Sequence, residues 1–537
     1  MLIPSLNSIN QKKQTIDNFL GIDNRPGAPF GSLKDSLGLT VNSYGALCSG
    51  VSIRNFYNGN GIDNLGISDQ LYFFYDNELV WDGSYTKLKC AKKQTAVIKF
   101  GIWVVVFPEK KAYNTETEEI ISLENTFEGE AEILVCSSDG TEISFVSSPH
   151  KPADAEYWCD TSASEPVLKR FASGSYYTVD SPKLKIKAEG IEEGFKVGDS
   201  VKVSALTPDS ERVIRALGEN YILVDGVLAS NINGSLVLKR EIPEINYAIA
   251  FGNRIWGTSK NGTEIYASAL GSFDNFFCFE GVSSDSYTVS VGDAGSFVGI
   301  AEFENALYFF KRDRVYSLFG TKPSNFQLRC YKIEGPKVGA NNQIVLHKGF
   351  LYYVSILGLM RFNGASSEPV LKKLKTSLTK CSLVSNGENL FFHADGNLFM
   401  INTDSMKVLK VYSGDISSVC YYLSYITFST SSGIKFLIMG DKSPEFMAEF
   451  NSGCEKAEKD SFLKRIYLNL MLGENSNLAV EISYDGKPYK VVSTLSGKNK
   501  SYYIPIQLSR HRELALRLSG SGIFRLYSVS LVKSEVE

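Results

Sequence analysis

The run Ala306-Leu-Tyr-Phe-Phe-Lys-Arg-Asp-Arg-Val-Tyr-Ser-Leu318 places two apolar segments, rich in aromatic and aliphatic residues, on either side of a charged turn. This pattern is typical of a β-hairpin. It occurs seven times in the chain, with polar or glycine-containing turns. The seven copies begin at Gln70, Gly101, Asn253, Ala306, Phe350, Asn389 and Tyr425.

The spacing of these hairpins predicts a repeat. The aliphatic residues near the head of the copies are Leu71, Ile102, Ile255, Leu307, Leu351, Leu390 and Ile426, and the last five are 52, 44, 39 and 36 residues apart. Units of about 40–50 residues with two clear inner strands are typical of four-stranded propeller blades. We therefore predict an all-β protein with a seven-unit β-propeller over residues 62–115 and 242–453. The alternative is a set of unrelated hairpins in several sandwiches.

The 153 residues between Ile102 and Ile255 exceed one such unit. They include a run with seven glutamates and no Lys or Arg (116–132), a Pro- and Ser-rich stretch (147–165) and the strictly alternating Lys183-Leu-Lys-Ile-Lys187. Strict alternation is typical of a half-buried strand. We expect a small inserted β-barrel domain over residues 116–241, because loops on a rigid scaffold tolerate insertions.

The two ends of the chain differ from the repeat. Residues 454–537 contain longer alternating segments, such as Glu513–Ser519, which predict a C-terminal antiparallel β-sandwich. Residues 1–61 are expected to form an N-terminal arm. Its best helix candidate is Gln11–Leu20, and Gly21–Gly61 is expected to be irregular and ordered by a neighbour.

Composition excludes several classes of protein. The 537 residues are 43% hydrophobic and carry a net charge of −3, so a basic footprint for duplex nucleic acid is absent. We find no apolar stretch long enough to predict a membrane-spanning helix, and the first residues lack a secretory pattern. The nine cysteines contain no CxxC pair, which predicts reduced, mostly buried thiols: Cys48, Cys90, Cys136, Cys159, Cys278, Cys330, Cys381, Cys420 and Cys454.

Motifs for catalysis are missing from the sequence. The closest match to a sialidase Asp box, Ser483–Tyr489, lacks one residue between Asp and Gly and is better interpreted as a turn. The four histidines lie far apart, and no GxSxG, Walker A or dinucleotide-binding pattern occurs. We therefore expect that the protein is not an enzyme and that it has no catalytic, cofactor-binding or metal-binding residues. A propeller glycan hydrolase would need two carboxylates across a cleft, which the sequence does not point to.

The stretch Gly252–Gly271, with Ser284–Tyr287, Leu307–Lys311 and Pro323–Phe326, resembles the stabilization proteins of tailed bacteriophages. The resemblance extends over most of the chain from Lys93. Further matching segments are Lys93-Gln94, Val106–Thr115, Asp139–Glu142, Ser501–Ile506 and Leu514–Ser528. The departures lie in the arm, at Gly31–Leu39 and Ser43–Gly45, and they leave the arm's contacts open.

Such proteins are similar to the propeller-bearing nozzle, or tail tube, proteins of short-tailed phages. The resemblance implies a structural virion protein, made in the host cytoplasm, that forms a ring in the virion tail, by analogy a hexamer, and takes part in DNA ejection. It also implies portal or head–tail adaptor proteins and tail fibres or spikes as partners, transient contact with DNA and no stable membrane insertion. The acidic run 116–132 would suit a channel wall that repels DNA. The alternative is a receptor- or glycan-binding tail protein that uses the C-terminal sandwich.

Overall fold

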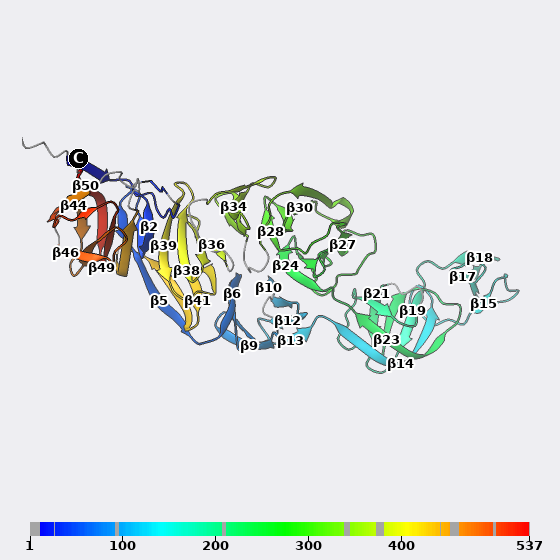
Figure 1. Ribbon diagram of the computed structural model, residues 1–537. Coiled ribbons are helices and arrows are strands. Elements are labelled where there is room, and N and C mark those ends of the chain that lie inside the picture. The colour runs from blue at the N-terminus through cyan, green and yellow to red at the C-terminus, as the bar shows by residue number, and fades with distance from the viewer. Residues whose placement is uncertain are drawn as a thin grey trace, which may run out of the picture. The chain divides into compact units, whose positions relative to one another are not determined.

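The computed structural model describes residues 11–25, 27–29, 31–91, 96–206, 211–337, 344–371, 381–440, 442–451, 461–497 and 501–535 (Figure 1). In these residues the regular structure is β-strand, apart from one 3-10 turn, η1 (Pro323–Asn325). The all-β prediction is confirmed for this part of the chain. It also holds no helix with the length and apolarity that a membrane crossing requires. Lys93, Gln94 and Cys454 lie outside the described residues.

The chain divides into two compact units, and each is described by itself. Unit 1 comprises Met1–Gln94, Phe310–Val315 and Cys330–Glu537. Unit 2 comprises Thr95–Phe309 and Tyr316–Arg329.

Unit 1 contains four antiparallel sheets of four strands, each built around one of the predicted hairpins. The first is β6 (Ile62–Ser68), β7 (Gln70–Tyr75), β8 (Glu78–Trp81) and β9 (Ser84–Lys89). The second is β32 (Val345–His347), β33 (Phe350–Ser355), β34 (Gly358–Phe362) and β35 (Ser367–Pro369). The third is β36 (Leu383–Ser385), β37 (Leu390–Ala394), β38 (Asn397–Asn402) and β39 (Lys407–Ser413). The fourth is β40 (Ser418–Tyr422), β41 (Tyr425–Thr430), β42 (Gly433–Met439) and β5 (Val51–Asn58).

Neighbouring sheets of unit 1 meet through their first strands. β36 lies against β32 and against β40, and β40 lies against β6. The middle strands are buried on both faces, as β33 and β37 illustrate. This two-sided burial explains why the hairpins read as continuous apolar runs in the sequence.

Unit 2 contains three more hairpin-centred sheets. The first is β10 (Ala96–Phe100), β11 (Trp103–Phe107), β12 (Lys111–Asn114) and β13 (Ile120–Ser122). The second is β24 (Ile245–Phe251), β25 (Arg254–Ser259), β26 (Glu264–Ala267) and β27 (Tyr287–Ser290). The third, most of which belongs to this unit, is β28 (Gly299–Phe303), β29 (Ala306–Phe310), β30 (Arg314–Phe319) and β31 (Gln327–Lys332). β24 lies against β10 and against β28.

The inserted domain of unit 2 is a closed six-stranded barrel, as predicted. Its strands, in order around the barrel, are β14 (Asn125–Cys136), β19 (Lys183–Lys187), β22 (Tyr221–Asp225), β21 (Arg212–Gly218), β20 (Ser200–Val203) and β23 (Ile232–Arg240). In β19, Leu184 and Ile186 are buried while the three lysines are half-exposed, as the alternation predicted. The barrel core is apolar and continuous around these two side chains.

A further four-stranded sheet lies within the insert and was not predicted. It consists of β15 (Val146–Ser148), β16 (Tyr157–Asp160), β17 (Val167–Ala172) and β18 (Ser175–Thr178), and its first two strands lie mostly in the Pro- and Ser-rich stretch 147–165. Its Leu168 belongs to the barrel's apolar core, and the Cys159 thiol contacts the Leu228 carbonyl at 3.4 Å. Short, half-exposed strands carry too little apolar pattern to be read from sequence.

The C-terminal region contains two antiparallel sheets that share one core, but they extend beyond the predicted residues 454–537, because Ser443–Phe450, expected in the propeller, and strands of the N-terminal arm belong to them. One sheet contains β3 (Leu39–Val41), β4 (Leu47–Ser49), β50 (Phe524–Glu535), β44 (Ser461–Leu472) and β47 (Ser501–Pro505), with β1 (Gln11–Ile16) on β50 and β48 (Arg510–His511) on β44. The other contains β2 (Leu33–Leu37), β43 (Ser443–Phe450), β49 (Leu514–Gly522), β45 (Asn477–Tyr484) and β46 (Lys490–Ser496). Phe446 of β43 stacks on Phe524 of β50, with ring centroids 4.6 Å apart, and joins the two layers.

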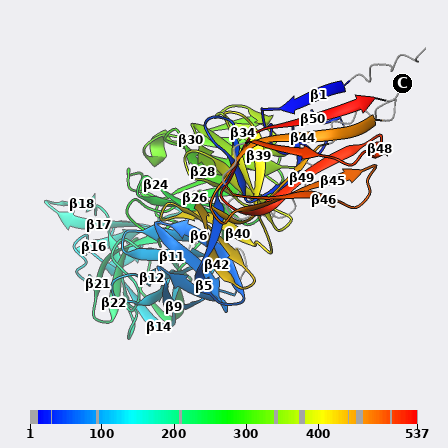
Figure 2. The ribbon, with the colours of Figure 1, turned by 90° about the vertical axis from the view of Figure 1, so that its left-hand side faces the viewer.

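Two predictions for the N-terminal arm are wrong. Gln11–Ile16, within the predicted helix Gln11–Leu20, is the strand β1, which pairs with β50 (Figure 2). Residues 33–58 are not irregular, because β2, β3 and β4 complete the sandwich and β5 completes the sheet of β40–β42. Long-range strand pairing decides the structure here, and the local sequence carries little of it.

Candidate functional site

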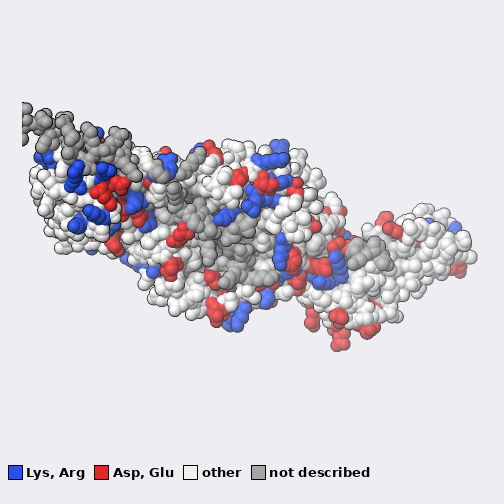
Figure 3. All heavy atoms as spheres, viewed as in Figure 1, with Lys and Arg blue, Asp and Glu red and all other residues white. Residues whose placement is uncertain are grey.

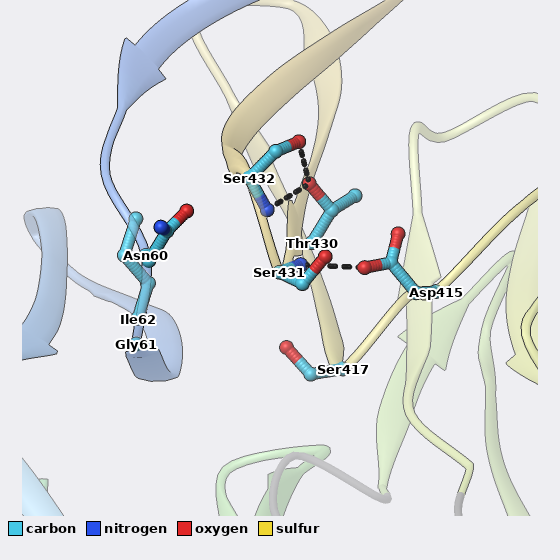
Figure 4. Close-up of a pocket in the computed structure, with 8 residues that line it drawn as sticks. All are labelled: Asn60, Gly61, Ile62, Asp415, Ser417, Thr430, Ser431 and Ser432. Atoms are coloured by element: carbon cyan, nitrogen blue, oxygen red, sulfur yellow. Dashed lines mark hydrogen bonds between the residues drawn. The ribbon is translucent and has the colours of Figure 1, made fainter.

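A pocket of about 600 Å³ lies in unit 1, where the first and the last of its hairpin-centred sheets meet (Figure 4). Asn60–Ile62 lead from β5 into β6, Asp415 and Ser417 precede β40, and Thr430–Ser432 form the turn between β41 and β42. The lining is polar, with four hydroxyl groups and one carboxylate. Such a lining suits a ligand with hydroxyl groups better than an apolar ligand.

Most of these polar groups already hydrogen-bond to the protein. The Ser431 amide donates to Asp415 Oδ2 at 2.8 Å, and hydrogen bonding by Ser431 lowers the pKa of Asp415. The Ser432 amide donates to Thr430 Oγ1 at 3.3 Å, and Ser417 Oγ lies 2.7 Å from a neighbouring serine hydroxyl. A single, firmly ionised carboxylate lacks the acid–base pair that glycoside hydrolysis uses.

A second pocket, of about 800 Å³, lies in unit 2 beside the sheet β15–β18. Four carboxylates are among its lining residues, and three of them have identified partners. Hydrogen bonds from Ser137 and Thr141 lower the pKa of Asp139 to about 2. Lys187 and Lys185 lower the pKa of Glu142.

Glu156 of this pocket is paired with Arg170 at 3.1 Å. A general acid needs a raised pKa, whereas the pKa shifts at Asp139 and Glu142 are in the opposite direction. The lining of this pocket therefore suits the binding of a polar or charged ligand better than acid–base catalysis.

One buried pair looks like a nucleophile and its base. Ser382 Oγ lies 2.8 Å from His393 Nδ1, and the Ser382 amide donates to the same nitrogen at 3.0 Å. Nδ1 is therefore an acceptor and the ring proton sits on Nε2. Burial lowers the pKa of His393 to about 4, and both residues are only 4% exposed. The pair is a hydrogen bond of the core, out of reach of a substrate.

The residues singled out in the sequence have structural places. Asp485, in the imperfect Asp box, accepts hydrogen bonds from the amides of Arg512 and Glu513 and lies in the turn after β45. Seven of the eight described cysteines are buried and Cys330 is exposed, and all eight are free thiols. This confirms the prediction for those eight.

The acidic run divides between two settings. Glu124 pairs with Lys110 at 2.6 Å. Glu128, Glu130 and Glu132 alternate along β14 on its exposed face, while Ala131 and Ile133 point into the barrel. Three glutamates thus share one solvated strand face.

The sequence analysis did not single out Cys278, Glu280 and Asp285, whose potential ligand atoms lie within 4.8 Å of one another. The only local signal is a cysteine followed by acids two and seven positions later. Among 59 acidic residues such a spacing carries little information by itself.

The sequence matches no protein-family model and no curated protein. Among solved structures it is similar to the extracellular domain of a one-component system from B. thetaiotaomicron, at 11% identity and a TM-score of 0.26, over 92% of this chain and 98% of that one. It is also similar to an exo-β-1,3-galactanase from Phanerochaete chrysosporium, at 10% identity and a TM-score of 0.20, over 53% of this chain and 94% of that one. A third is Kluyveromyces lactis Hsv2, at 11% identity and a TM-score of 0.20, over 59% and 97%. Likenesses this weak carry no argument about function.

Proposed function

We propose that this chain is a structural protein of a bacteriophage tail, in which seven hairpin-centred sheets close into a β-propeller and copies of the chain assemble into a ring. The ring extends and closes the DNA channel below the portal. In this role the chain provides a stiff wall and binding surfaces for its neighbours in the tail. It has no catalytic task.

The propeller part of the proposal rests on how unit 1 joins the two ends of its repeat. β5, from the N-terminal region, is the fourth strand of the last sheet and pairs with β42, from Val51 opposite Met439 to Asn58 opposite Gly433. β40 of that sheet lies against β6 of the first sheet. A closed propeller needs this junction, because only closure removes the free edges of an open array.

The tail part of the proposal is carried by the resemblance of Gly252–Gly271 to the phage stabilization proteins. The matched segments contact each other through Arg254, which is 2% exposed. Its guanidinium donates to the carbonyl oxygens of Ser268 at 2.7 Å and Asp285 at 2.5 Å. Arg254 thus joins Gly252–Gly271 to Ser284–Tyr287, two of the segments that carry the resemblance.

The charge distribution is compatible with a DNA channel. On the face shown in Figure 3, acidic and basic residues are interspersed. In the proposed particle, the exposed glutamates Glu128, Glu130 and Glu132 of β14 face the channel. A negative wall keeps the phosphate backbone from adhering during passage.

The proposal is tested on phage particles purified from cells that make this chain. Mass spectrometry is expected to find the chain in density-purified particles at several copies per portal ring, and cryo-electron microscopy is expected to place it as a ring below the portal. Particles that lack the chain would refute the proposal. A chain present at one or two copies would refute the ring.

A second candidate, the glycan-binding tail protein, is favoured by an aromatic surface on the sandwich. Tyr503 of β47 is 56% exposed and its ring lies 5.4 Å from that of Tyr467, over which the Lys13 ammonium lies at 5.7 Å. Exposed tyrosines form stacking platforms for sugars. A glycan array would test this with the whole chain, since a fragment of residues 455–537 lacks β1–β4 and β43. Binding that Tyr503→Ala abolishes would favour this candidate, and an array without binding would reject it.

A further inference from the structure

The connection between β26 and β27 packs against the barrel within unit 2. The Ser200 hydroxyl of β20 donates to the Phe277 carbonyl at 2.8 Å. The Asn275 side-chain amide donates to the Gly198 carbonyl at 2.7 Å. The connection therefore joins the sheet β24–β27 to the inserted domain, and its conformation is held from both sides.

Three side chains that could coordinate a metal converge in this connection. One potential ligand atom each of Cys278, Glu280 and Asp285 lies within 4.8 Å of the other two. The Cys278 sulfur is 4.0 Å from Glu280 Oε2. Cys278 and Asp285 are 8% and 5% exposed, whereas Glu280 is exposed. Two of the three ligand residues are thus buried, and the third reaches the surface.

The Asp285 carboxylate points to a missing ligand. Its Oδ2 accepts hydrogen bonds from three consecutive amides, those of Glu280 at 2.7 Å, Gly281 at 2.6 Å and Val282 at 3.1 Å. Its Oδ1 is buried and has no hydrogen-bond partner. A buried carboxylate oxygen without a partner is costly, and such groups are rare in native proteins. A cation beside Oδ1 would remove that cost.

Like Asp285, Glu280 has one carboxylate oxygen that is held by hydrogen bonding. Its Oε1 accepts a hydrogen bond from the Arg215 guanidinium, which also donates to Asp225 Oδ2 at 2.5 Å. This leaves Oε2, the oxygen near the Cys278 sulfur, available.

We propose that Cys278, Glu280 and Asp285 form a zinc-binding site, with the cysteine sulfur and one oxygen of each carboxylate as ligands and water in the fourth position. Zinc accepts sulfur and carboxylate ligands in tetrahedral geometry, and a thiolate favours it over magnesium or calcium. Tetrahedral ligands lie about 3.5 Å apart, so the three donors draw together by roughly 1 Å. The three amides and Arg215 form the outer shell that orients the carboxylates.

Binding is a simple exchange of a proton for a metal ion. The Cys278 S–H bond breaks, the sulfur keeps the electron pair and bonds to zinc, and one proton is released to solvent for each ion bound. No oxidation or reduction takes place. The site would fasten the β26–β27 connection against the barrel, and this inference does not depend on the proposed tail function.

The experiment uses the untagged, full-length chain, reduced and stripped of metal with EDTA. Calorimetric titration with zinc is expected to give one ion per chain. Because protons are released to the buffer, the observed heat should be more exothermic in buffers with a larger ionisation enthalpy. Cobalt(II), as a coloured substitute, is expected to show a thiolate-to-cobalt absorption band in the near ultraviolet. Cys278→Ser should abolish the band and weaken zinc binding by at least about tenfold. Cys159→Ser, which changes another buried cysteine of unit 2, should retain both.

Two further variants keep the inference testable if Cys278→Ser does not fold. Asp285→Asn removes the buried charge at constant shape, and Glu280→Gln changes the exposed ligand; each should weaken zinc binding at least tenfold. The absence of zinc binding by the wild-type chain would overturn the inference. Unchanged affinity in the folded Cys278→Ser variant, or in both carboxylate variants, would also overturn it.

Discussion

Gly433, the first residue of β42, pairs with Asn58, the last residue of the N-terminal strand β5. Its φ is +140°, and a Cβ built there would lie 2.0 Å from the Tyr57 carbonyl oxygen. Gly433→Ala therefore forces the backbone of β5 outward by roughly 1 Å, since real Cβ contacts do not fall below 3.0 Å. The Gly59 amide, which donates to the Ser432 carbonyl at 3.3 Å, loses its partner in the same movement.

The barrel offers a control with the same backbone cost. Gly234 has φ of +155° and nothing within 4 Å of its hypothetical Cβ. Both alanine variants are strained by about 1–3 kcal/mol from the φ alone. Gly433→Ala should lose about two ladder hydrogen bonds in addition, worth about 2 kcal/mol together. At 1.4 kcal/mol per factor of ten, the opening equilibrium of β5 then shifts about 30-fold.

Hydrogen–deuterium exchange measured by mass spectrometry reports this directly. Peptides that cover Val51–Asn58 should exchange about 30-fold faster in Gly433→Ala than in Gly234→Ala, because β5 opens more often. Peptides of the barrel around β23 should show the opposite difference, with faster exchange in Gly234→Ala, because the strain of that variant lies in the barrel. If exchange in β5 stays within threefold of the control, then the close approach of Gly433 to Tyr57 does not secure this strand, and the reasoning fails.

Three further predictions concern buried charge and reactivity. The pKa of His393 is lowered from 6.5 to about 4, so its contribution to stability is complete above pH 6.5 and is lost as the pH falls from 6.5 towards 4. The free energy of unfolding in urea should therefore decrease between about pH 7.5 and pH 5 by about 2 kcal/mol more in the wild type than in His393→Gln. In the wild type, the buried Asp199 carboxylate lies 2.5 Å from the Arg240 guanidinium, and Arg240→Met removes this ion pair. The free energy of unfolding should decrease by about 3–5 kcal/mol, which is seen as a lower melting temperature, and Asp199→Asn in the same chain should recover part of the loss. Under native conditions, a maleimide should modify Cys330 before the other described cysteines, because it alone among them is exposed; peptide mapping that finds Cys278 or Cys420 modified first would contradict the burial pattern.

The inner strands could be predicted from sequence because both of their faces are buried. β29 and β37 are buried at every position and almost entirely apolar or aromatic, so a single sequence already shows them. The outer strands escaped notice because they are short and half-exposed, as β13 and β15 are. Their side chains contribute little burial, and backbone pairing alone holds them in the sheet.

The arm and the cluster of Cys278, Glu280 and Asp285 could not be predicted for two different reasons: the partner strand of β1 is remote in sequence, whereas the cluster depends on the conformation of a single loop. β1 reads Gln-Lys-Lys-Gln-Thr-Ile and has no apolar period, yet it pairs along its whole length with β50. Cys278, Glu280 and Asp285 converge only because one carboxylate oxygen collects three successive amides in a tight loop. Neither arrangement has a local signature that a single sequence reveals.

The barrel enters and leaves its host at one place. Asn125, at the start of β14, is paired with Arg240, at the end of β23, so the two connections to the rest of unit 2 run side by side. Leu123 and Ile242, just outside this pair, belong to the apolar core of the host sheets and not to the barrel. A two- or three-residue bridge between these connections could therefore replace the insert while the apolar core of the host sheets is kept. The β26–β27 connection would then lose its hydrogen bonds to Ser200 and Gly198.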